Sequence, residues 1–393
     1  MAGKAPGLRM QVQWSDEPER LPFQKQWESF STYNLGRWKG KALHLDPVTG
    51  EYIEPFLVNT MVDVMPMDVG VQSAKQRVSL GGTDDGAPQM TETVITVNDE
   101  FQSSDDGSYS YDRSLVQVAS LPEATFRFSI EFSLAISSAE RVRCLALYDF
   151  QSKLSRIILV EEQRVQSTGA QRLIGIKLDA EPEPTTRDPL TLLSCMGEFR
   201  GDAVGRRASR IGGGDQRFGS RSDMQWSQNK LRREMQVLDQ RNRITRKTTW
   251  GAISSPAESV VDMGNGHRLL MLPSSCYVCL PTQLESTPPA APVTDDDASS
   301  APETSPGPEG PEAVKRALEA AFSAEGQQQG DGELADVESF SAEFGCFVNG
   351  GKDVLRTVRI YTNDGKMAST TTMAEKRVGD ATGSGLSYDQ FES

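Results

Sequence analysis

The hexapeptide LGRWKG at residues 35–40 decides the fold, because it recurs in altered form as MGEFRG at residues 196–201, 161 positions later. Both copies read apolar, Gly, any residue, aromatic, basic, Gly. The tetrapeptide SIEF at residues 129–132 likewise recurs as SAEF at residues 341–344, 212 positions later. At an offset of 213, Arg143, Tyr148, Glu162 and Arg164 match Arg356, Tyr361, Glu375 and Arg377. Matches that keep their order over such distances indicate two copies of one unit.

An acidic stretch at residues 284–338 explains the growth of the offset. It holds 2 basic and 13 acidic side chains and seven prolines, and Phe322 is its one aromatic residue. Such a composition buries too little apolar surface to offset the entropy of ordering the chain, so it predicts a disordered insertion in the second copy. The expected organisation is an N-terminal tail (1–23), a first unit (24–168), a linker (169–189), a second unit (190–380) and a C-terminal tail (381–393).

Each unit reads as short strands joined by tight turns. In residues 125–136, large apolar side chains occupy every second position, as in a strand with one apolar face. Further strand-like segments follow at 141–148 and 154–162. The second copy gives the same meander, with a tight turn at Asn363-Asp364-Gly365. Long amphipathic helices are scarce. The sequence therefore predicts an all-β protein made of two tandem antiparallel β-barrels.

The triplet Gly36-Arg37-Trp38 at the start of a β unit that ends with Arg164 resembles the lipocalin-like barrels of the calycin superfamily. The resemblance implies that Trp38 closes the barrel floor and that Arg164 packs over it; Gly197, Phe199 and Arg377 are the matching residues of the second unit. More narrowly, the segments QWESFSTYNLGRWKG, FSIEFSLAISSAERVRCLALYD and LSRIILVEEQR are similar to a lipocalin-like family of cyanobacteria and plastids, distantly related to the S-type phycobilin lyases.

This resemblance implies a small hydrophobic or tetrapyrrole-like ligand, such as a bilin or a chlorophyll derivative, in the first barrel, and a plastid location with the cytoplasm as the alternative. Strand parity and the resemblance together nominate Trp38, His44, Phe128, Ile130, Arg143 and Arg156 as ligand-binding residues. Either arginine would hold a carboxylate of the ligand. A chromophore-attaching enzyme of the bilin lyase kind and a ligand-free assembly scaffold are the alternatives.

Composition and motifs reduce the range of functions and partners that this protein could have. A net charge of −14 argues against nucleic acid as a partner. The sequence has two histidines, His44 and His267, which are too few for a multi-histidine metal centre. No apolar run is long enough to span a bilayer, and no catalytic signature is present, which favours binding over catalysis. In the motif Cys276-Tyr277-Val278-Cys279, strand parity places the two thiols on opposite faces. Residues 200–247 carry 13 basic and 5 acidic groups, and we interpret them as solvated strand faces or as a docking surface for an acidic protein.

Overall fold

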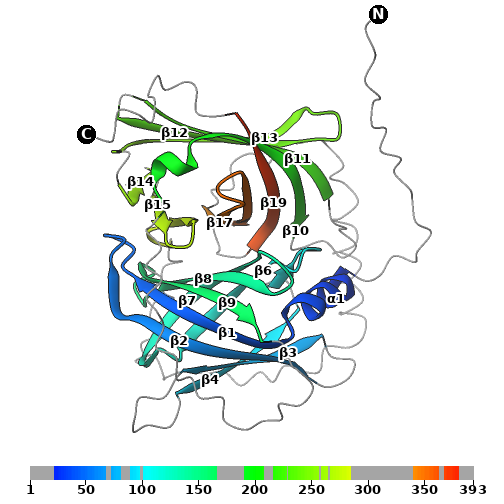
Figure 1. Ribbon diagram of the computed structural model, residues 1–393, viewed down its shortest axis with the longest axis vertical. Helices are drawn as coiled ribbons and strands as arrows, with labels where there is room; N and C mark the ends of the chain where they lie inside the picture. Colours follow the sequence, from blue (N-terminus) through cyan, green and yellow to red (C-terminus); the bar gives the residue numbers. More distant parts are fainter. Residues whose placement is uncertain are drawn as a thin grey trace, which may run out of the picture.

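The computed structural model describes residues 22–67, 72–80, 89–97, 101–165, 190–207, 216–227, 229–255, 258–263, 266–284, 340–362 and 367–379. Both predicted tails, apart from residues 22–23, as well as the linker, the acidic insertion except Leu284, and the turn at 363–365 lie outside the described residues. Two antiparallel sheets each roll into a barrel, and the barrels lie one above the other (Figure 1). The predicted all-β fold with two tandem antiparallel barrels is therefore confirmed.

The first barrel is a nine-stranded sheet in the order β4-β3-β2-β1-β9-β8-β7-β6-β5. Its strands are β1 (Gly36–Leu45), β2 (Tyr52–Pro66), β3 (Ser73–Leu80), β4 (Met90–Thr96), β5 (Phe101–Ser103), β6 (Tyr109–Val118), β7 (Leu121–Ala135), β8 (Glu140–Tyr148) and β9 (Leu154–Arg164). Side chains join β6 to β4: Arg113 Nη1 donates to Thr93 Oγ1 at 3.1 Å, and Tyr111 Oη to Val94 O at 3.3 Å. These contacts bring the edges of the sheet together.

The second barrel has ten strands in the order β13-β12-β11-β10-β19-β18-β17-β16-β15-β14. They are β10 (Gly197–Arg207), β11 (Gln216–Ser227), β12 (Lys230–Leu238), β13 (Ile244–Ile253), β14 (Val260–Asp262), β15 (His267–Leu272), β16 (Cys276–Pro281), β17 (Phe340–Val348), β18 (Asp353–Tyr361) and β19 (Met367–Gly379). Matching registers show that β1–β4 correspond to β10–β13 and that β6–β9 correspond to β16–β19.

The repeated glycines of the two hexapeptides have geometric causes. Gly36 and Gly197 adopt φ values of 119° and 128°, a conformation that side-chain-bearing residues rarely take. A Cβ at Gly40 would lie 2.6 Å from Glu161 O on β9, and one at Gly201 would lie 1.9 Å from Ala374 O on β19. Each barrel thus needs one glycine to start its first strand and another to let its first and last strands approach.

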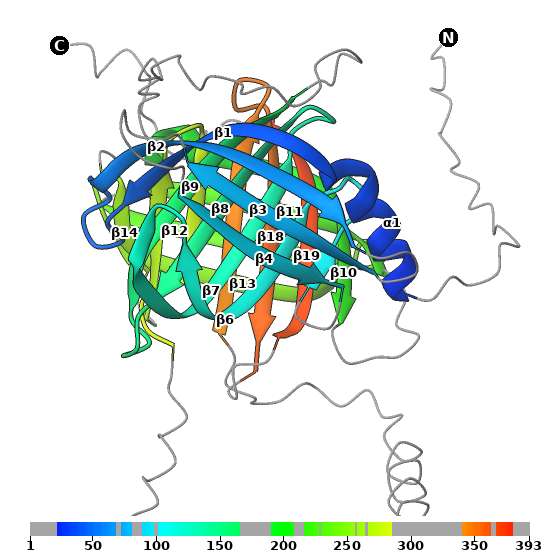
Figure 2. The ribbon, with the colours of Figure 1, turned by 90° about the horizontal axis from the view of Figure 1, so that it is seen from below.

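One end of the first barrel is covered by helix α1 (Pro22–Asn34), which the sequence did not predict (Figure 2). Phe30 on this helix packs edge-on against Phe101 and Tyr109, with ring centroids 5.1 and 5.4 Å away. A short 3₁₀ helix (Leu192–Cys195) occupies the corresponding place before β10. Neither of the helices among the described residues is long and apolar enough to cross a membrane.

The two barrels share one apolar core, which lies between them rather than inside either. Alternate residues of β7, β8 and β9 pack there against those of β16, β17 and β18. Phe132 and its repeat equivalent Phe344 meet with ring centroids 6.1 Å apart. Tyr148 Oη donates to Pro281 O on β16, while its equivalent Tyr361 donates to Asp112 on β6. The interface therefore has approximate twofold symmetry.

Candidate functional site

Trp38 closes the helix-covered end of the first barrel between two guanidinium groups. Its side chain is 1% exposed, and the Cζ atoms of Arg141 and Arg164 lie 4.1 and 4.8 Å from the ring centroid. The indole Nε1 donates to Asn34 O at 3.0 Å, at the end of α1. Arg164 donates to the carbonyl of Tyr33. The structure brings Trp38 and Arg164 together; sequence reasoning missed Arg141.

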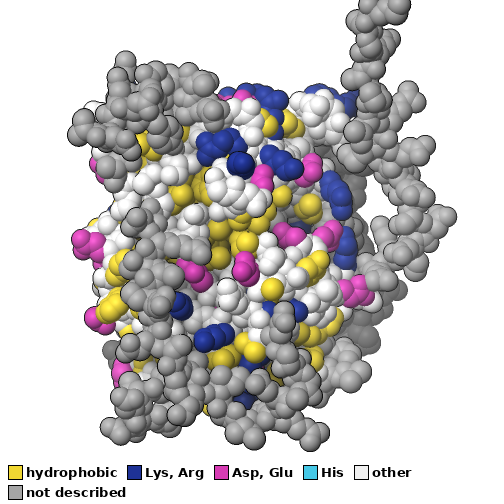
Figure 3. Space-filling view, in the orientation of Figure 1, with side chains coloured by type: hydrophobic (Ala, Val, Ile, Leu, Met, Phe, Trp, Pro, Cys, Tyr) yellow, Lys and Arg dark blue, Asp and Glu magenta, His cyan; other side chains and the backbone are white. Residues whose placement is uncertain are grey.

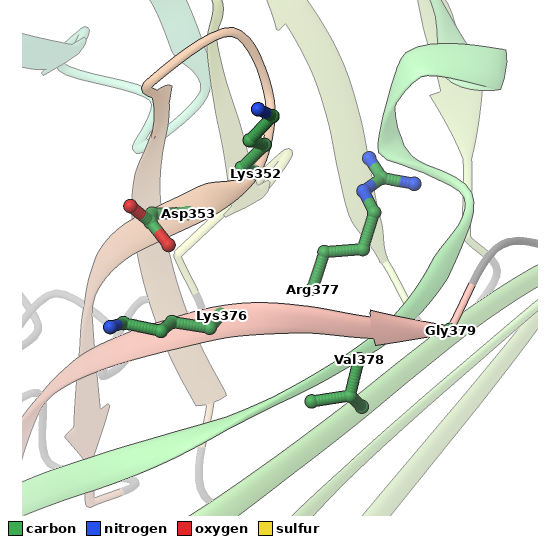
Figure 4. Close-up of a pocket in the computed structure, with 6 residues that line it drawn as sticks. All are labelled: Lys352, Asp353, Lys376, Arg377, Val378 and Gly379. Carbon is green, nitrogen blue, oxygen red and sulfur yellow. The ribbon is translucent and has the colours of Figure 1, made fainter.

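The second barrel has a reduced version of this closure. Arg377 lies 4.7 Å from the Phe199 ring centroid and donates to Met196 O and to Ser194 O. Val354 stands where the first barrel has Arg141. A hollow of about 410 Å³ lies beside Arg377, whose guanidinium points towards the 3₁₀ segment (Figure 4). Because that group is already bound to carbonyls, the hollow is not our candidate site.

A buried charge network fills the middle of the first barrel. Arg143 Nη1 bonds Glu131 Oε1 at 2.8 Å, while its Nη2 and Nε bond the two oxygens of Glu162 at 2.7 and 2.9 Å. Tyr109 Oη donates to Glu131 at 2.9 Å, and Arg141 Nε donates to Glu162 at 2.5 Å. All three guanidinium nitrogens of Arg143 bond glutamates inside the barrel. Arg143 therefore has no free donor for a ligand carboxylate, which corrects that expectation.

The second barrel repeats the network with Tyr277, Glu343, Arg356 and Glu375. Tyr277 Oη donates to Glu343 Oε1 at 2.6 Å, and Arg356 Nη2 bonds Glu375 at 2.6 Å. Its extra cation is Arg233 of β12, which bonds Glu343. Burial tends to raise the pKa of the glutamates, but their arginine partners outweigh it: the pKa values of Glu131, Glu162 and Glu343 lie below the ordinary range. These three glutamates are therefore ionised, and each is held by at least one buried arginine.

The opposite end of the first barrel carries His44 and Arg156, two of the sequence-predicted residues, in contact. Arg156 Nη1 lies 3.1 Å from His44 Nδ1 and donates to Glu54 O at 2.8 Å. Because arginine only donates, His44 Nδ1 is the acceptor and the neutral ring carries its proton on Nε2. Burial, with the nearby charge of Arg156, lowers the pKa of His44 to about 4. His44 is thus neutral at physiological pH.

This end of the barrel has apolar walls and unfilled hydrogen bonds. His44 is 0% exposed, and its Nε2 has no partner among the described residues. Arg156 bonds through Nη1 only, and its Nε and Nη2 make no hydrogen bond within the described part of the chain, although the charge of Asp46 lies nearby. Phe56, which has the same strand parity as Val58 on β2, is 54% exposed. The apolar residues of this end include Ala42, Val58, Val116, Phe126, Leu145, Leu147, Ile158 and Val160.

In the second barrel, an aromatic side chain fills the position that corresponds to His44. Gly205 stands where the first barrel has His44, and Phe218 stands where it has Val58. A Cβ on Gly205 would lie 2.9 Å from the Phe218 ring, so this ring occupies the space of the missing side chain. Ser369 replaces Arg156. The contact between a histidine and an arginine at this end is thus a feature of the first barrel.

Two of the predicted ligand-binding residues lie elsewhere. Ile130 is part of the core between the barrels, and Phe128 packs against that core, with its ring centroid 6.2 Å from that of Tyr148. The expectation that both point into the first barrel is therefore wrong. The physical reason is that β7 is buried on both faces, and the apolar face is the one turned towards the second barrel.

A cleft of about 850 Å³ runs between the barrels. Lys39, Lys41 and Glu161 contribute charged groups from the first barrel, while Phe347 and Asn349 line it from the second. In the space-filling view, apolar side chains appear in the middle of the molecule with charged ones around them (Figure 3). The described residues contain no group of three or more His, Cys, Asp or Glu that could hold a metal.

The outer charges of β10–β13 largely pair with one another. Arg200 and Arg221 each bond Glu198, at 2.7 and 2.9 Å, and Arg232 and Lys247 each bond Glu234 at 3.0 Å. This arrangement is that of a solvated strand face. An acidic protein partner for residues 200–247 stays a prediction.

Residues 23–167 match the protein-family model described as "Domain of unknown function (DUF3598), N-terminal". The first barrel thus corresponds to the N-terminal DUF3598 domain model over its whole length. A protein of unknown function from the DUF3598 family of Nostoc punctiforme, solved by crystallography, is 17% identical and aligns with a TM-score of 0.57 over 90% of this chain and 99% of that chain. That similarity extends the DUF3598 fold to both barrels, and the matches confirm the family resemblance predicted from the sequence.

An S-type phycobiliprotein lyase from Guillardia theta aligns with 38% of this chain and 95% of its own, at 15% identity and a TM-score of 0.26. Comparison with curated proteins gave no match.

Proposed function

We propose that this protein binds, without catalysing a reaction, a small amphipathic carboxylate in the open end of its DUF3598 domain. The observation that carries the proposal is the pair of unfilled donors there: the Nε–Nη2 edge of Arg156 and the buried Nε2–H of His44. A guanidinium edge matches the two oxygens of a carboxylate and forms charge-assisted hydrogen bonds. The apolar walls suit the hydrocarbon part of such a ligand.

Tetrapyrroles with propionate groups are the class that the sequence resemblance implies, and they combine a large apolar ring system with carboxylates. In the proposed complex, Arg156 binds one carboxylate and His44 Nε2 donates to a second acceptor. The ring system lies against Val58 and Phe56, while the charge network below forms the floor. Because all three guanidinium nitrogens of Arg143 already bond Glu131 and Glu162, this pair of glutamates with its arginine supplies shape rather than binding groups.

The test is a titration of the full-length protein with biliverdin and with chlorophyllide, followed by tryptophan quenching. The full chain is used because the outer face of β7–β9 is covered by the second barrel. We expect saturable binding to one of the pigments. Arg156→Ala should weaken it about 10- to 100-fold, the value of a hydrogen bond to a charged group. Val58→Phe, which copies the Phe218 plug, should abolish it.

Arg77→Ala is the matched control, because Arg77 bonds Glu92 on the outer face of the same barrel. It should leave the affinity unchanged. If neither pigment binds, or if Arg156→Ala and Arg77→Ala bind alike, the site is wrong. The ligand-free scaffold would then be the better interpretation, since the filled network and the plugged second barrel fit it.

A further inference from the structure

Two cysteines face each other where β16 and β17 pair, at the edge of the core between the barrels. Cys276 and Cys346 are direct cross-strand partners. The next pair along is joined by a hydrogen bond of 2.8 Å from Phe347 N to Ser275 O. Since bonded and non-bonded pairs alternate in antiparallel sheets, the cysteines occupy a non-hydrogen-bonded pair, where Cα atoms lie about 4.5 Å apart. That separation falls within the range that disulfides span, about 4.4–6.8 Å.

The two thiols also converge on one acceptor. Cys276 Sγ donates to Ser274 O at 3.4 Å, and Cys346 Sγ lies 3.7 Å from the same oxygen. Ser274 and Ser275 hold the turn before β16 in left-handed conformations, with φ values of 60° and 58°. Both cysteines are free thiols in the structure. Sharing an acceptor brings the sulfur atoms to the same side of the strand pair.

We propose that Cys276 and Cys346 form a reversible disulfide by exchange with a low-molecular-weight disulfide that enters through the cleft between the barrels. Cys346 lines that cleft, and Cys276 lies behind it with 0% exposure. Burial and a hydrogen bond with Cys346 hold the pKa of Cys276 well above its ordinary value. Cys346 is therefore the thiol that reacts first, and Cys276 is the resolving thiol.

The exchange proceeds in two balanced steps. Cys346 loses its proton and its sulfur attacks one sulfur of the reagent, which breaks the S–S bond and releases one thiolate. Cys276 then loses its proton and attacks Cys346 in the mixed disulfide, which forms the protein disulfide and releases the second thiolate. The two protons are taken up by the released thiolates, so the reagent is reduced to two thiols and the cysteine pair is oxidised.

The link has a structural consequence because of where it lies. The connection from β16 to β17 runs through the acidic insertion, and β16 and β17 are adjacent in the sheet. A disulfide between Cys276 and Cys346 would hold these strands together independently of that long connection. Closing a long loop stabilises the folded state. The oxidised protein should therefore unfold at a higher temperature than the reduced one.

The experiment equilibrates the full-length protein with oxidised glutathione, alkylates the remaining thiols and maps tryptic peptides by mass spectrometry. We expect a linked pair of peptides 269–315 and 317–352 that disappears after reduced glutathione is added. Cys279 lies in the first of these peptides but belongs to the core inside the second barrel, so Cys279→Ala is the matched control. The link should persist in Cys279→Ala and be lost in Cys276→Ala and in Cys346→Ala.

Absence of the linked pair after equilibration with excess oxidised glutathione would overturn the proposal. So would a link that survives Cys276→Ala, because it would then run through Cys279. The thermal midpoint provides a second readout on the same samples. Oxidation should raise it for the parent and for Cys279→Ala, and should leave it unchanged for Cys276→Ala.

Discussion

The two barrels keep the same four-residue charge network but support it with arginines that lie on different strands. In the first barrel Arg141 of β8 supports Glu162, and Gln76 of β3 is neutral. In the second, Val354 replaces Arg141 and Arg233 of β12, at the position of Gln76, supports Glu343. Arg113 adds a further cation beside Glu131 in the first barrel. The buried glutamates thus need arginine partners, but the strand that supplies the supporting arginine is not fixed. Glu375 is left with one cation, Arg356, and a hydroxyl, Ser222.

Removing the arginine that bonds both glutamates of a network, Arg143 or Arg356, should lower the unfolding free energy most. Arg356→Met leaves Glu375 buried without a cation, whereas after Arg143→Met Glu162 keeps Arg141 and Glu131 keeps Arg113. Breaking a buried pair typically costs about 3–5 kcal/mol. We expect Arg356→Met to lie at the upper end of that range and Arg143→Met at the lower end. Urea unfolding followed by circular dichroism measures the loss in both variants. Equal losses would show that Arg141 and Arg113 do not compensate for the missing guanidinium.

The next prediction concerns the pH dependence of stability, to which the first barrel contributes through His44 and the second, with Gly205 at that position, does not. His44 has a folded pKa of about 4 against an ordinary value near 6.5, so only the unfolded chain takes up a proton as the pH falls between these values. The stability that neutral His44 contributes is complete above pH 6.5 and declines towards pH 4, by about 3 kcal/mol in total. His44→Gln should flatten this decline, and urea unfolding at pH 7.5, 6, 5 and 4.5 measures it. An unchanged slope would mean that His44 is solvated.

An exchange of the closing aromatic residues should have a smaller effect. Trp38→Phe removes the hydrogen bond to Asn34 O and part of the stacking on Arg141, and we expect a loss of about 1–2 kcal/mol. The reciprocal Phe199→Trp adds bulk to a filled site and should also destabilise, by about 1–3 kcal/mol. Thermal unfolding of both variants tests whether each closure is fitted to its own barrel. A stabilising Phe199→Trp would show unfilled space there.

The smallest effect is expected at the interface. Arg359 bonds Asp112 at 2.7 Å on one side, where the symmetry-related positions hold Ala146 and Leu280. Tyr361 also donates to Asp112. The triple variant Arg359→Ala/Asp112→Leu/Tyr361→Phe therefore makes this side apolar and should change the unfolding free energy by less than about 1 kcal/mol, because replacing buried paired groups by apolar ones is often neutral. Arg359→Ala alone or Asp112→Leu alone leaves a buried polar group and should cost several times more.

The sequence predicted the barrels but not which side chains of β7 and β8 point inwards, since Phe128 and Ile130 were expected inside together with Arg143. The repeats at Trp38/Phe199 and Glu162/Glu375 mark residues that every copy needs, and they led directly to two barrels. Alternation along β8 shows which residues share a face, but not which face is inside. A charged face normally meets water, whereas here Arg141 and Arg143 point into the barrel and the apolar face meets the other barrel. His44 was identifiable because it shares strand parity with Trp38, and the structure pairs β1 with β9 so that it meets Arg156.

The contact between Phe132 and its own equivalent Phe344 has an evolutionary consequence. When equivalent residues of two similar units meet across an interface, each unit presents the same patch, as the subunits of a twofold homodimer do. Such an arrangement is what fusion of two copies of one gene would leave behind, if the ancestral chain was a single barrel that paired with itself. Once both halves lie in one polypeptide, they no longer need to stay alike. One mouth could then keep its histidine and arginine while a phenylalanine filled the other.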